Sequence, residues 1–114
     1  MIISKIDGGI GNQLFRYAAG RRLAHKWDTE FKLDISPYAK RAWPAYALNA
    51  FDIKGTVATT EEIQSLKKFK EKRAWHFWPE VLEYPDEIYI SGAWEDERYF
   101  SDIADVTVSS RLCK

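Results

Sequence analysis

The residues with the clearest capacity for chemistry lie near the start of the chain, in the run Gly8-Gly9-Ile10-Gly11-Asn12-Gln13. Glycines at three of four successive positions let the backbone adopt positive φ and approach a ligand closely. If a helix follows, its first N–H groups point into the same space and carry partial positive charge from the aligned peptide dipoles. This arrangement suits a phosphate or diphosphate, although a tight turn that binds nothing can use the same glycines.

The segments on either side of these glycines predict a strand, a turn and a helix. An isoleucine-rich run over residues 2–6 predicts a short buried strand, and the run from Leu14 to Trp27 predicts an amphipathic helix. Apolar residues recur every four positions in that run, as Phe15, Ala19, Leu23 and Trp27. Arg22 falls beside this stripe, and we expect its stem to lie over the core with its charged head in water.

A second strand is predicted over Phe31–Ile35, which completes a strand–helix–strand unit of about 30 residues. Its Asp34 lies about 20 residues beyond the glycines, where dinucleotide-binding domains place an acid for the ribose. The dinucleotide fingerprint G-x-G-x-x-G is incomplete, because Leu14 stands where its third glycine would be. A small dinucleotide-binding domain therefore stays an alternative. Asp7 would repel a diphosphate, so we expect it to point away or cap the helix.

The rest of the chain predicts fewer elements. Residues 37–58 look irregular, and Thr59 with Glu62 forms a capping box that starts another helix. We expect that helix to extend through Phe69, with Lys67–Lys72 at its C-terminal end. Further on, residues 88–91 predict a strand that Gly92 ends, and residues 96–104 predict a helix, whereas residues 105–114 predict no element.

Aromatic residues are concentrated between Ala74 and Tyr84. Flat apolar rings suit the C–H faces of sugars, but a small hydrophobic cluster is the more ordinary role of such a run.

Length and composition predict one soluble domain spanning residues 1–114. The hydrophobic share of 46% can build a core, and the 17 basic residues balance 17 acidic ones, which argues against general nucleic-acid binding. The lone Cys113 fits a reducing compartment, so we expect a cytoplasmic protein.

His25 and His76 have no metal-ligand spacing, and His25 is expected at the surface. No apolar run approaches the roughly 20 residues of a membrane span.

Four blocks of sequence resemble the bacterial α-1,2-fucosyltransferases of glycosyltransferase family 11. Residues 8–21 resemble the opening G-G-[LI]-G-N-Q-[ML]-F-x-Y-A-x-G-R of that family, and Leu33-Asp34 resembles its following L-D. Residues 46–53 are similar to its Y-x-L-x-x-F-x-I, and residues 92–100 are similar to its G-Y-W-Q-S-E-K-Y-F. The blocks come in the family's order.

The resemblance implies an α/β fold: a Rossmann-like parallel sheet with flanking helices, corresponding to the N-terminal half of a GT-B-like glycosyltransferase. It also implies inverting, metal-independent transfer of fucose from GDP-fucose to the 2-hydroxyl of a galactoside. The chain departs from the pattern at Arg22, Ala93 and Glu95, and its 114 residues contain no counterpart of the family's H-x-R-R-G-D-Y segment, whose arginine holds the donor diphosphate. We therefore expect a truncated N-terminal domain that is inactive alone.

The resemblance implies that the nucleotide-sugar donor meets the glycine turn, whose residues are Gly8, Gly9, Gly11, Asn12 and Gln13. It assigns no catalytic base, no metal and no cofactor besides the donor GDP-fucose. The expected partners are this donor and a glycan acceptor. Peripheral association with the inner face of a membrane stays open, as does a non-catalytic remnant that binds a glycan or a protein. A missing second domain predicts self-association through an uncovered apolar face.

Overall fold

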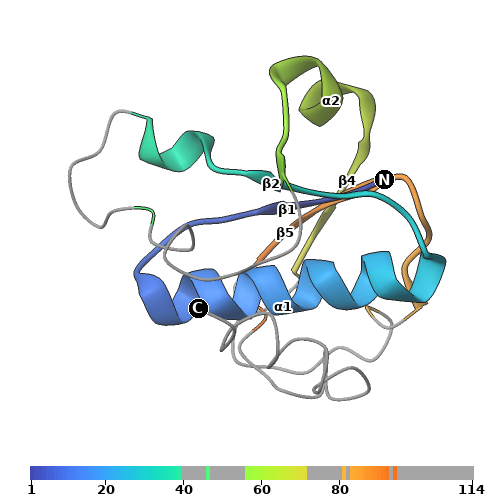
Figure 1. Ribbon diagram of the computed structural model, residues 1–114, viewed down its shortest axis with the longest axis horizontal. Coiled ribbons are helices and arrows are strands. Elements are labelled where there is room, and N and C mark those ends of the chain that lie inside the picture. Colours follow the sequence, from blue (N-terminus) through green and yellow to red (C-terminus); the bar gives the residue numbers. More distant parts are fainter. Residues whose placement is uncertain (40–45, 47–55, 72–80, 82, 93, 95–114) are drawn as a thin grey trace.

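The computed structural model of the chain describes residues 1–39, 46, 56–71, 81, 83–92 and 94 (Figure 1). The predicted helix at 96–104, the final segment 105–114 and most of the aromatic run at 74–84 lie outside these residues. Most of the segment predicted to be irregular, 37–58, also lies outside them. Within it, residues Thr56–Val57 form a strand, so the prediction is wrong there, because pairing with the strand at Lys32 and Leu33 organises these two residues.

The described residues form an α/β fold around a five-stranded parallel sheet, as predicted. The strands are β1 (Ile2–Lys5), β2 (Phe31–Asp34), β3 (Thr56–Val57), β4 (Lys67–Lys70) and β5 (Ile88–Ser91). Helix α1 (Ile10–Trp27) covers one face of the sheet, and the short helix α2 (Thr60–Ser65) lies over the other (Figure 1). A 3₁₀ turn, η1 (Ser36–Tyr38), follows β2.

The strand order β3-β2-β1-β5-β4 places β1 at the centre, where the direction of the chain across the sheet reverses. β1 pairs with β2 on one side, with Ile2 beside Phe31, and with β5 on the other, with Ile2 beside Ile88. In open α/β sheets, the crevice beyond the carboxyl ends of the strands at such a switch point is where ligands bind. The glycine turn follows β1 at this edge.

The hydrophobic core lies between the sheet and α1. Its fully buried members include Ile2, Ile6, Leu23, Leu33 and Ile90. Alternation along β1 places Ser4 on the same face as Ile2, and its hydroxyl donates to the carbonyl oxygen of Arg16 in α1 at 2.8 Å. The burial of apolar side chains on this face fixes how α1 lies across the sheet.

Helix α1 begins at Ile10, so the prediction that it starts at Leu14 is wrong. Gly9 is its N-cap with an extended backbone, and the first helical hydrogen bond runs from the N–H of Gln13 to the carbonyl of Gly9, at 2.9 Å. Gly11 and Asn12 are poor helix formers, and they suggested a longer turn. Packing of the residues that follow them overrides that local preference, since most helical stability comes from the buried face.

The apolar stripe of α1 is only partly as predicted. Ala19 and Leu23 are buried, whereas Trp27 is 43% exposed and its indole N–H donates to the carbonyl oxygen of Tyr84 at 2.9 Å. Arg22 is 8% exposed, so the expectation that its head lies in water is wrong. His25 is exposed in the last turn of α1, as predicted.

Gly20 sets the distance between α1 and the sheet. A Cβ atom at this position would lie 2.5 Å from Cε1 of Phe31 and 2.8 Å from Cβ of Ser4. Non-bonded carbon atoms essentially never approach one another this closely. The close approach of α1 to the strands therefore requires glycine at position 20. Close helix–strand packing is the role of the third glycine in dinucleotide fingerprints, and in this chain Gly20 performs it from further along the helix.

Helix α2 has the predicted capping box but ends at Ser65, because Lys67–Lys70 form strand β4. The prediction of a helix extending through Phe69 is therefore wrong. Phe69 turns toward the core and packs on Tyr84, with ring centroids 4.7 Å apart. Lys68 points the other way, and its ammonium donates to the carbonyl oxygens of Ile63 and Leu66 at the end of α2. A lysine thus stabilises the helix end from the neighbouring strand.

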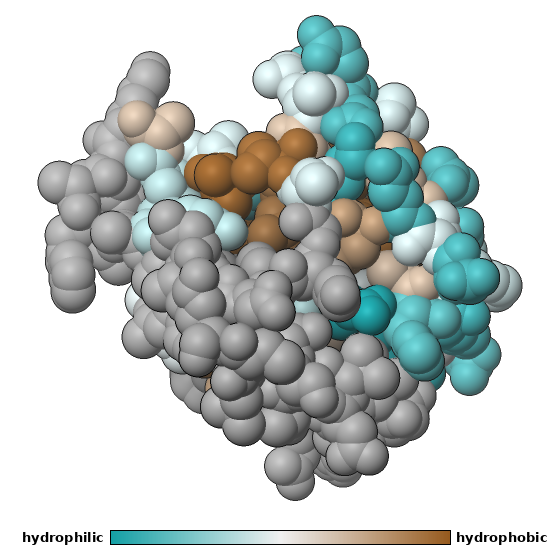
Figure 2. Space-filling model, in the orientation of Figure 1, coloured by the Kyte–Doolittle hydropathy of each residue, from teal (hydrophilic) through white to brown (hydrophobic). Residues whose placement is uncertain are grey.

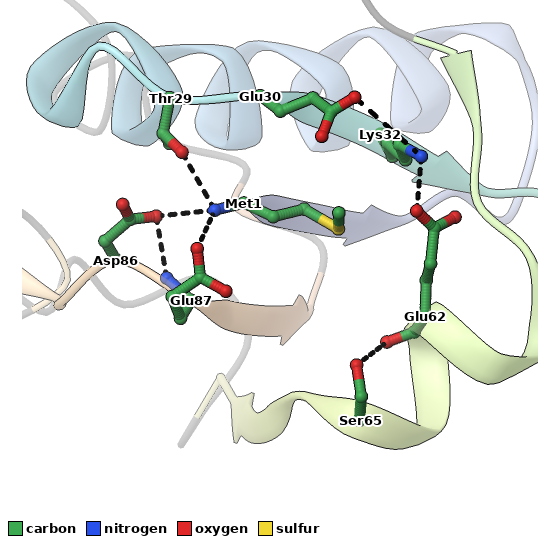
Figure 3. Close-up of polar contacts among 8 residues, drawn as sticks. All are labelled: Met1, Thr29, Glu30, Lys32, Glu62, Ser65, Asp86 and Glu87. Carbon is green, nitrogen blue, oxygen red and sulfur yellow. Dashed lines mark hydrogen bonds and ion pairs between the residues drawn. The ribbon is translucent and has the colours of Figure 1, made fainter.

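Two sets of ionic contacts tie the sheet together at its amino end and toward α2 (Figure 3). The amino group of Met1 donates to Thr29 Oγ1 at 2.8 Å and to Asp86 Oδ1 at 2.9 Å, and it also bonds Glu87. In the second set, Lys32 on β2 bonds the carboxylate of Glu62 on α2. This bond raises the pKa of Lys32 and lowers the pKa of Glu62.

Candidate functional site

The glycine turn leaves β1 through a backbone conformation that only glycine adopts easily. Gly8 has a φ of 79°, and a Cβ atom there would lie 2.7 Å from Nδ2 of Asn12. The carboxylate of Asp7 accepts a hydrogen bond from the N–H of Gly8 at 2.8 Å. No side chain of the described residues caps α1, so Asp7 folds back on the turn instead of serving as the cap.

Two side chains hold the carbonyl oxygen of Gly8. The amide Nε2 of Gln13 donates to it at 3.1 Å, and the hydroxyl of Tyr38 donates to it at 2.7 Å. Gln13 is fully buried, unlike the exposed Asn12 beside it. Its amide therefore lies behind the turn and shapes it, whereas the sequence had suggested that it lines the site directly.

The opposite side of the turn is exposed at Gly11 and Asn12. Among the residues that the structure describes, none lies within 4 Å of a Cβ atom placed at Gly9 or at Gly11. The N–H groups of the first helical turn, at residues 10–12, come before the first intrahelical bond and meet no capping side chain of the described residues. They carry the positive end of the dipole of an 18-residue helix, which can bind an anion.

The carboxyl ends of the neighbouring strands lie on both sides of this turn. The N–H of Ile6 donates to the carbonyl of Asp34 at 2.9 Å, which extends the pairing of β1 with β2 beyond the last paired residues. On the other side, Ser4 of β1 pairs with Ile90 of β5, and Gly92 follows the end of β5. Trp94 beyond it is fully buried with a φ of 53°. A large side chain in the left-handed region is uncommon and costs roughly 1–3 kcal/mol.

Asp34 is buried at this edge, and both of its carboxylate oxygens have protein partners. Oδ2 accepts a hydrogen bond from the hydroxyl of Tyr89 at 2.5 Å, and Oδ1 accepts one from the N–H of Ser36 at 3.0 Å. Burial, together with this bond to Asp34, raises the pKa of Tyr89. The two bonds fix the orientation of the carboxylate. Asp34 therefore stabilises the edge of the sheet through protein contacts alone, independently of any ligand.

A cavity of about 320 Å³ lies next to Asp34, between η1, the end of β3 and the start of α2. Its apolar lining includes Ile35, Val57 and Ile63. Figure 2 shows hydrophobic side chains gathered at the base of the notch between η1 and α2. Tyr38 also lines the cavity, and the same residue bonds the carbonyl of Gly8. The cavity and the glycine turn are therefore neighbours joined by one side chain.

Sequence reasoning missed three residues that shape this site. Tyr38 and Tyr89 come from segments that gave no chemical motif, and their partners are 30 and 55 residues away. Gly20 gave a signal that was available: a glycine on the apolar side of a predicted helix indicates close approach of a neighbouring element. The two tyrosines gave none, because only the fold brings them to their partners.

The part of the chain that the structure describes has neither a cluster of metal-ligand residues nor a membrane-spanning helix. It contains no group of three or more His, Cys, Asp or Glu residues placed to hold a metal ion. Neither of its helices is long and apolar enough to cross a membrane.

Comparison with known proteins gave no match to any family model, to any curated protein or to any solved structure. A functional assignment therefore rests on the sequence blocks and on the geometry of the carboxyl edge.

Proposed function

We propose that this chain is the N-terminal domain of an α-1,2-fucosyltransferase with a GT-B-like architecture. In this proposal Gly9, Gly11 and Asn12 contact the diphosphate of GDP-fucose through the open side of the turn. Gly8 and Gln13 keep the turn in the required shape. A galactoside is the acceptor, and the protein acts in the cytoplasm.

The observation that carries the proposal is the position of the four sequence blocks. Their described members come from distant parts of the chain: the glycine turn, Asp34, Tyr46 and the pair Gly92 and Trp94. Asp34 is the last residue of β2 and Gly92 follows β5, and these two strands flank β1. The ring of Tyr46 lies 5.9 Å from the ring of Tyr38, which bonds Gly8. Blocks that gather at one ligand-binding edge are expected of a functional set.

The chemistry of fucosyl transfer explains what this edge could contribute. Departure of GDP leaves negative charge on the diphosphate, and the N-terminal end of α1 provides oriented N–H groups and a favourable dipole for that charge. The 114 residues contain no H-x-R-R-G-D-Y arginine. Removal of one major electrostatic donor costs roughly 10²–10³ in rate, so we propose that the chain alone binds the donor without transferring fucose.

A titration followed by amide chemical shifts tests this proposal. GDP and GDP-fucose should shift the amide resonances of residues 9–12, and NAD at the same concentrations should not. The chain alone should release no more GDP from GDP-fucose than buffer does. A response to NAD at this edge without a response to GDP would instead support the small dinucleotide-binding domain that Asp34 suggested.

Self-association is a further part of the proposal. Val57 is a large hydrophobic residue that is 54% exposed on the short edge strand β3, and Trp27 is 43% exposed at the end of α1. Sedimentation at increasing concentration should show a rising average mass. A constant monomer mass at high concentration would refute this part alone.

A further inference from the structure

Residues 56–66, which comprise β3, α2 and the links beside them, cross the sheet without contributing a single buried residue. By contrast, β1, β2 and β5 consist mostly of buried residues. β3 lies at an edge of the described sheet and pairs with β2 over two residues, and the N–H of Ala58 adds one bond to the carbonyl oxygen of Leu33. Because burial of apolar surface is the main source of local stability, residues 56–66 are held less firmly than the strands beneath them.

This segment has little slack. It leaves β3 at one edge of the sheet and reaches β4 at the other edge, four strand spacings or about 19 Å away. Residues 58–66 span this distance, and their greatest reach is about 24 Å because six of them are helical. Helix α2 therefore cannot rise far from the sheet while both ends stay paired.

Of the two ends, β3 is the one that releases first. β4 pairs with β5 over four residues, and its Phe69 packs on Tyr84, whereas the two residues of β3 are both exposed. Since the helix can lift only when an end comes free, the lifting of α2 and the release of β3 form one event.

Polar bonds from two strands hold this segment closed. Lys32 on β2 bonds the carboxylate of Glu62, which also closes the capping box of α2 (Figure 3). The side chains of Lys32 and Glu62 are only 15% and 24% exposed, so water and salt screen this ion pair less than an ordinary surface pair. At the other end, Lys68 on β4 donates to the carbonyl oxygens of Ile63 and Leu66.

The cavity beyond β2 depends on the same segment. Val57, Ala58, Thr60 and Ile63 supply one wall of the cavity, and residues from the segment 34–39 supply the other. When α2 lifts and β3 leaves β2, the first wall moves away and the cavity opens to solvent.

We infer that residues 56–66 are a gate, in which β3 and α2 open and close over the sheet as one unit. The ion pair of Lys32 with Glu62 is the latch of this gate, and access to the cavity requires the latch to break. The gate does not depend on the proposed function, because no nucleotide or sugar takes part in it.

Native-state hydrogen exchange of the complete chain, in low concentrations of urea, tests the gate. Ala58 and Ile63 report on it, because their N–H groups are hydrogen-bonded while it is closed, and Ile2 and Ile6 report on the central sheet in the same way. The two gate amides should share one protection factor and one urea dependence, both smaller than those of Ile2 and Ile6.

Two lysine variants test the latch. Lys32→Gln should lower the protection factors of both gate amides by roughly threefold or more and leave the two sheet amides unchanged. Lys26→Gln is the matched control, since it breaks an ion pair with Glu83 on α1, away from the gate, and should change neither gate amide. The sheet amides also confirm that each variant is folded.

Three outcomes would overturn the inference. If Ile63 exchanges freely while Ala58 stays as protected as Ile6, α2 frays alone and residues 56–66 are not one unit. If Lys32→Gln changes neither gate amide, the ion pair is not the latch. If Lys32→Gln lowers protection equally at the gate and in the sheet, the pair stabilises the whole domain and controls no separate opening.

Discussion

The hydroxyl of Tyr38 donates a hydrogen bond to the carbonyl oxygen of Gly8, at 2.7 Å, and this bond joins two parts of the carboxyl edge. Gly8 begins the turn into α1, and Tyr38 ends the 3₁₀ turn that follows β2. The same carbonyl accepts the amide of the buried Gln13. The shape of the turn is thus fixed from two elements, which leaves its other side available to an anion.

Removal of the Tyr38 hydroxyl should loosen the turn without unfolding the domain. We expect Tyr38→Phe to reduce the free energy of unfolding by about 1 kcal/mol, because Gly8 keeps its bond to Gln13. Urea denaturation measures the change, and Gln64→Ala on the exposed side of α2 should change stability by less than about 0.5 kcal/mol. Equal stability of Tyr38→Phe and the wild type would show that the bond contributes nothing.

Two glycines of α1 should respond in opposite ways to the same substitution. Gly20→Ala forces a Cβ atom against Phe31 and Ser4, and we expect it to destabilise the domain by about 1–3 kcal/mol. Gly11→Ala meets open space at a helical position, so it should be neutral or stabilise by up to about 1 kcal/mol. Thermal melts of the two variants form a matched pair. If Gly20→Ala melts at the wild-type temperature, the described contact between α1 and the sheet is incorrect.

The amino group of Met1 should make stability depend on alkaline pH. Although burial alone would lower its pKa, the hydrogen bonds that it donates to Glu87 and Asp86 outweigh burial and raise the pKa above its ordinary value of 8.0. Because the pKa is raised in the folded state, the protonated amine stabilises the fold fully only below the ordinary value of 8.0. This stabilisation is lost as pH rises through the raised pKa.

The urea midpoint, measured from about pH 7 to about pH 10, should therefore fall more steeply for the wild type than for the double variant Asp86→Asn, Glu87→Gln. The double variant keeps every other titrating group. The difference between the two profiles therefore isolates the contribution of the contacts between the Met1 amino group and the carboxylates of Asp86 and Glu87. Parallel profiles would mean that the contacts of Met1 do not stabilise the fold.

Local patterns were sufficient to predict the parts of the fold that local physics decides. The isoleucine-rich strand before the glycines, the strand at residues 88–91 and the capping box of Thr59 and Glu62 are all found. Each depends on side-chain alternation or on a bond between near neighbours in the chain. The hydrogen bond from Tyr89 to Asp34 joins residues that are 55 positions apart in the chain, so no local sequence pattern predicts it.

The errors came where distant contacts override local preference. Lys67–Lys70 carries the charges expected at a helix end, yet pairing with β5 and burial of Phe69 against Tyr84 make it a strand. Gly11 and Asn12 resemble turn residues, but the packing of α1 on the sheet starts the helix before them. In the candidate site, residue identity placed Asn12 and Gln13 together and could not show that Gln13 is buried whereas Asn12 is exposed.

The most direct test of the central claim is calorimetric titration of GDP into the wild type and the variant Asn12→Asp, with Gln64→Glu as a control for added charge. Asn12→Asp keeps the side-chain shape and adds a negative charge within the first turn of α1, where it favours the helix but repels a diphosphate. We predict that GDP binds the wild type and Gln64→Glu equally and binds Asn12→Asp about tenfold or more weakly, with no loss of thermal stability. Equal GDP affinity of Asn12→Asp and the wild type, or no GDP binding by the wild type, would contradict the assignment of this turn as a diphosphate site.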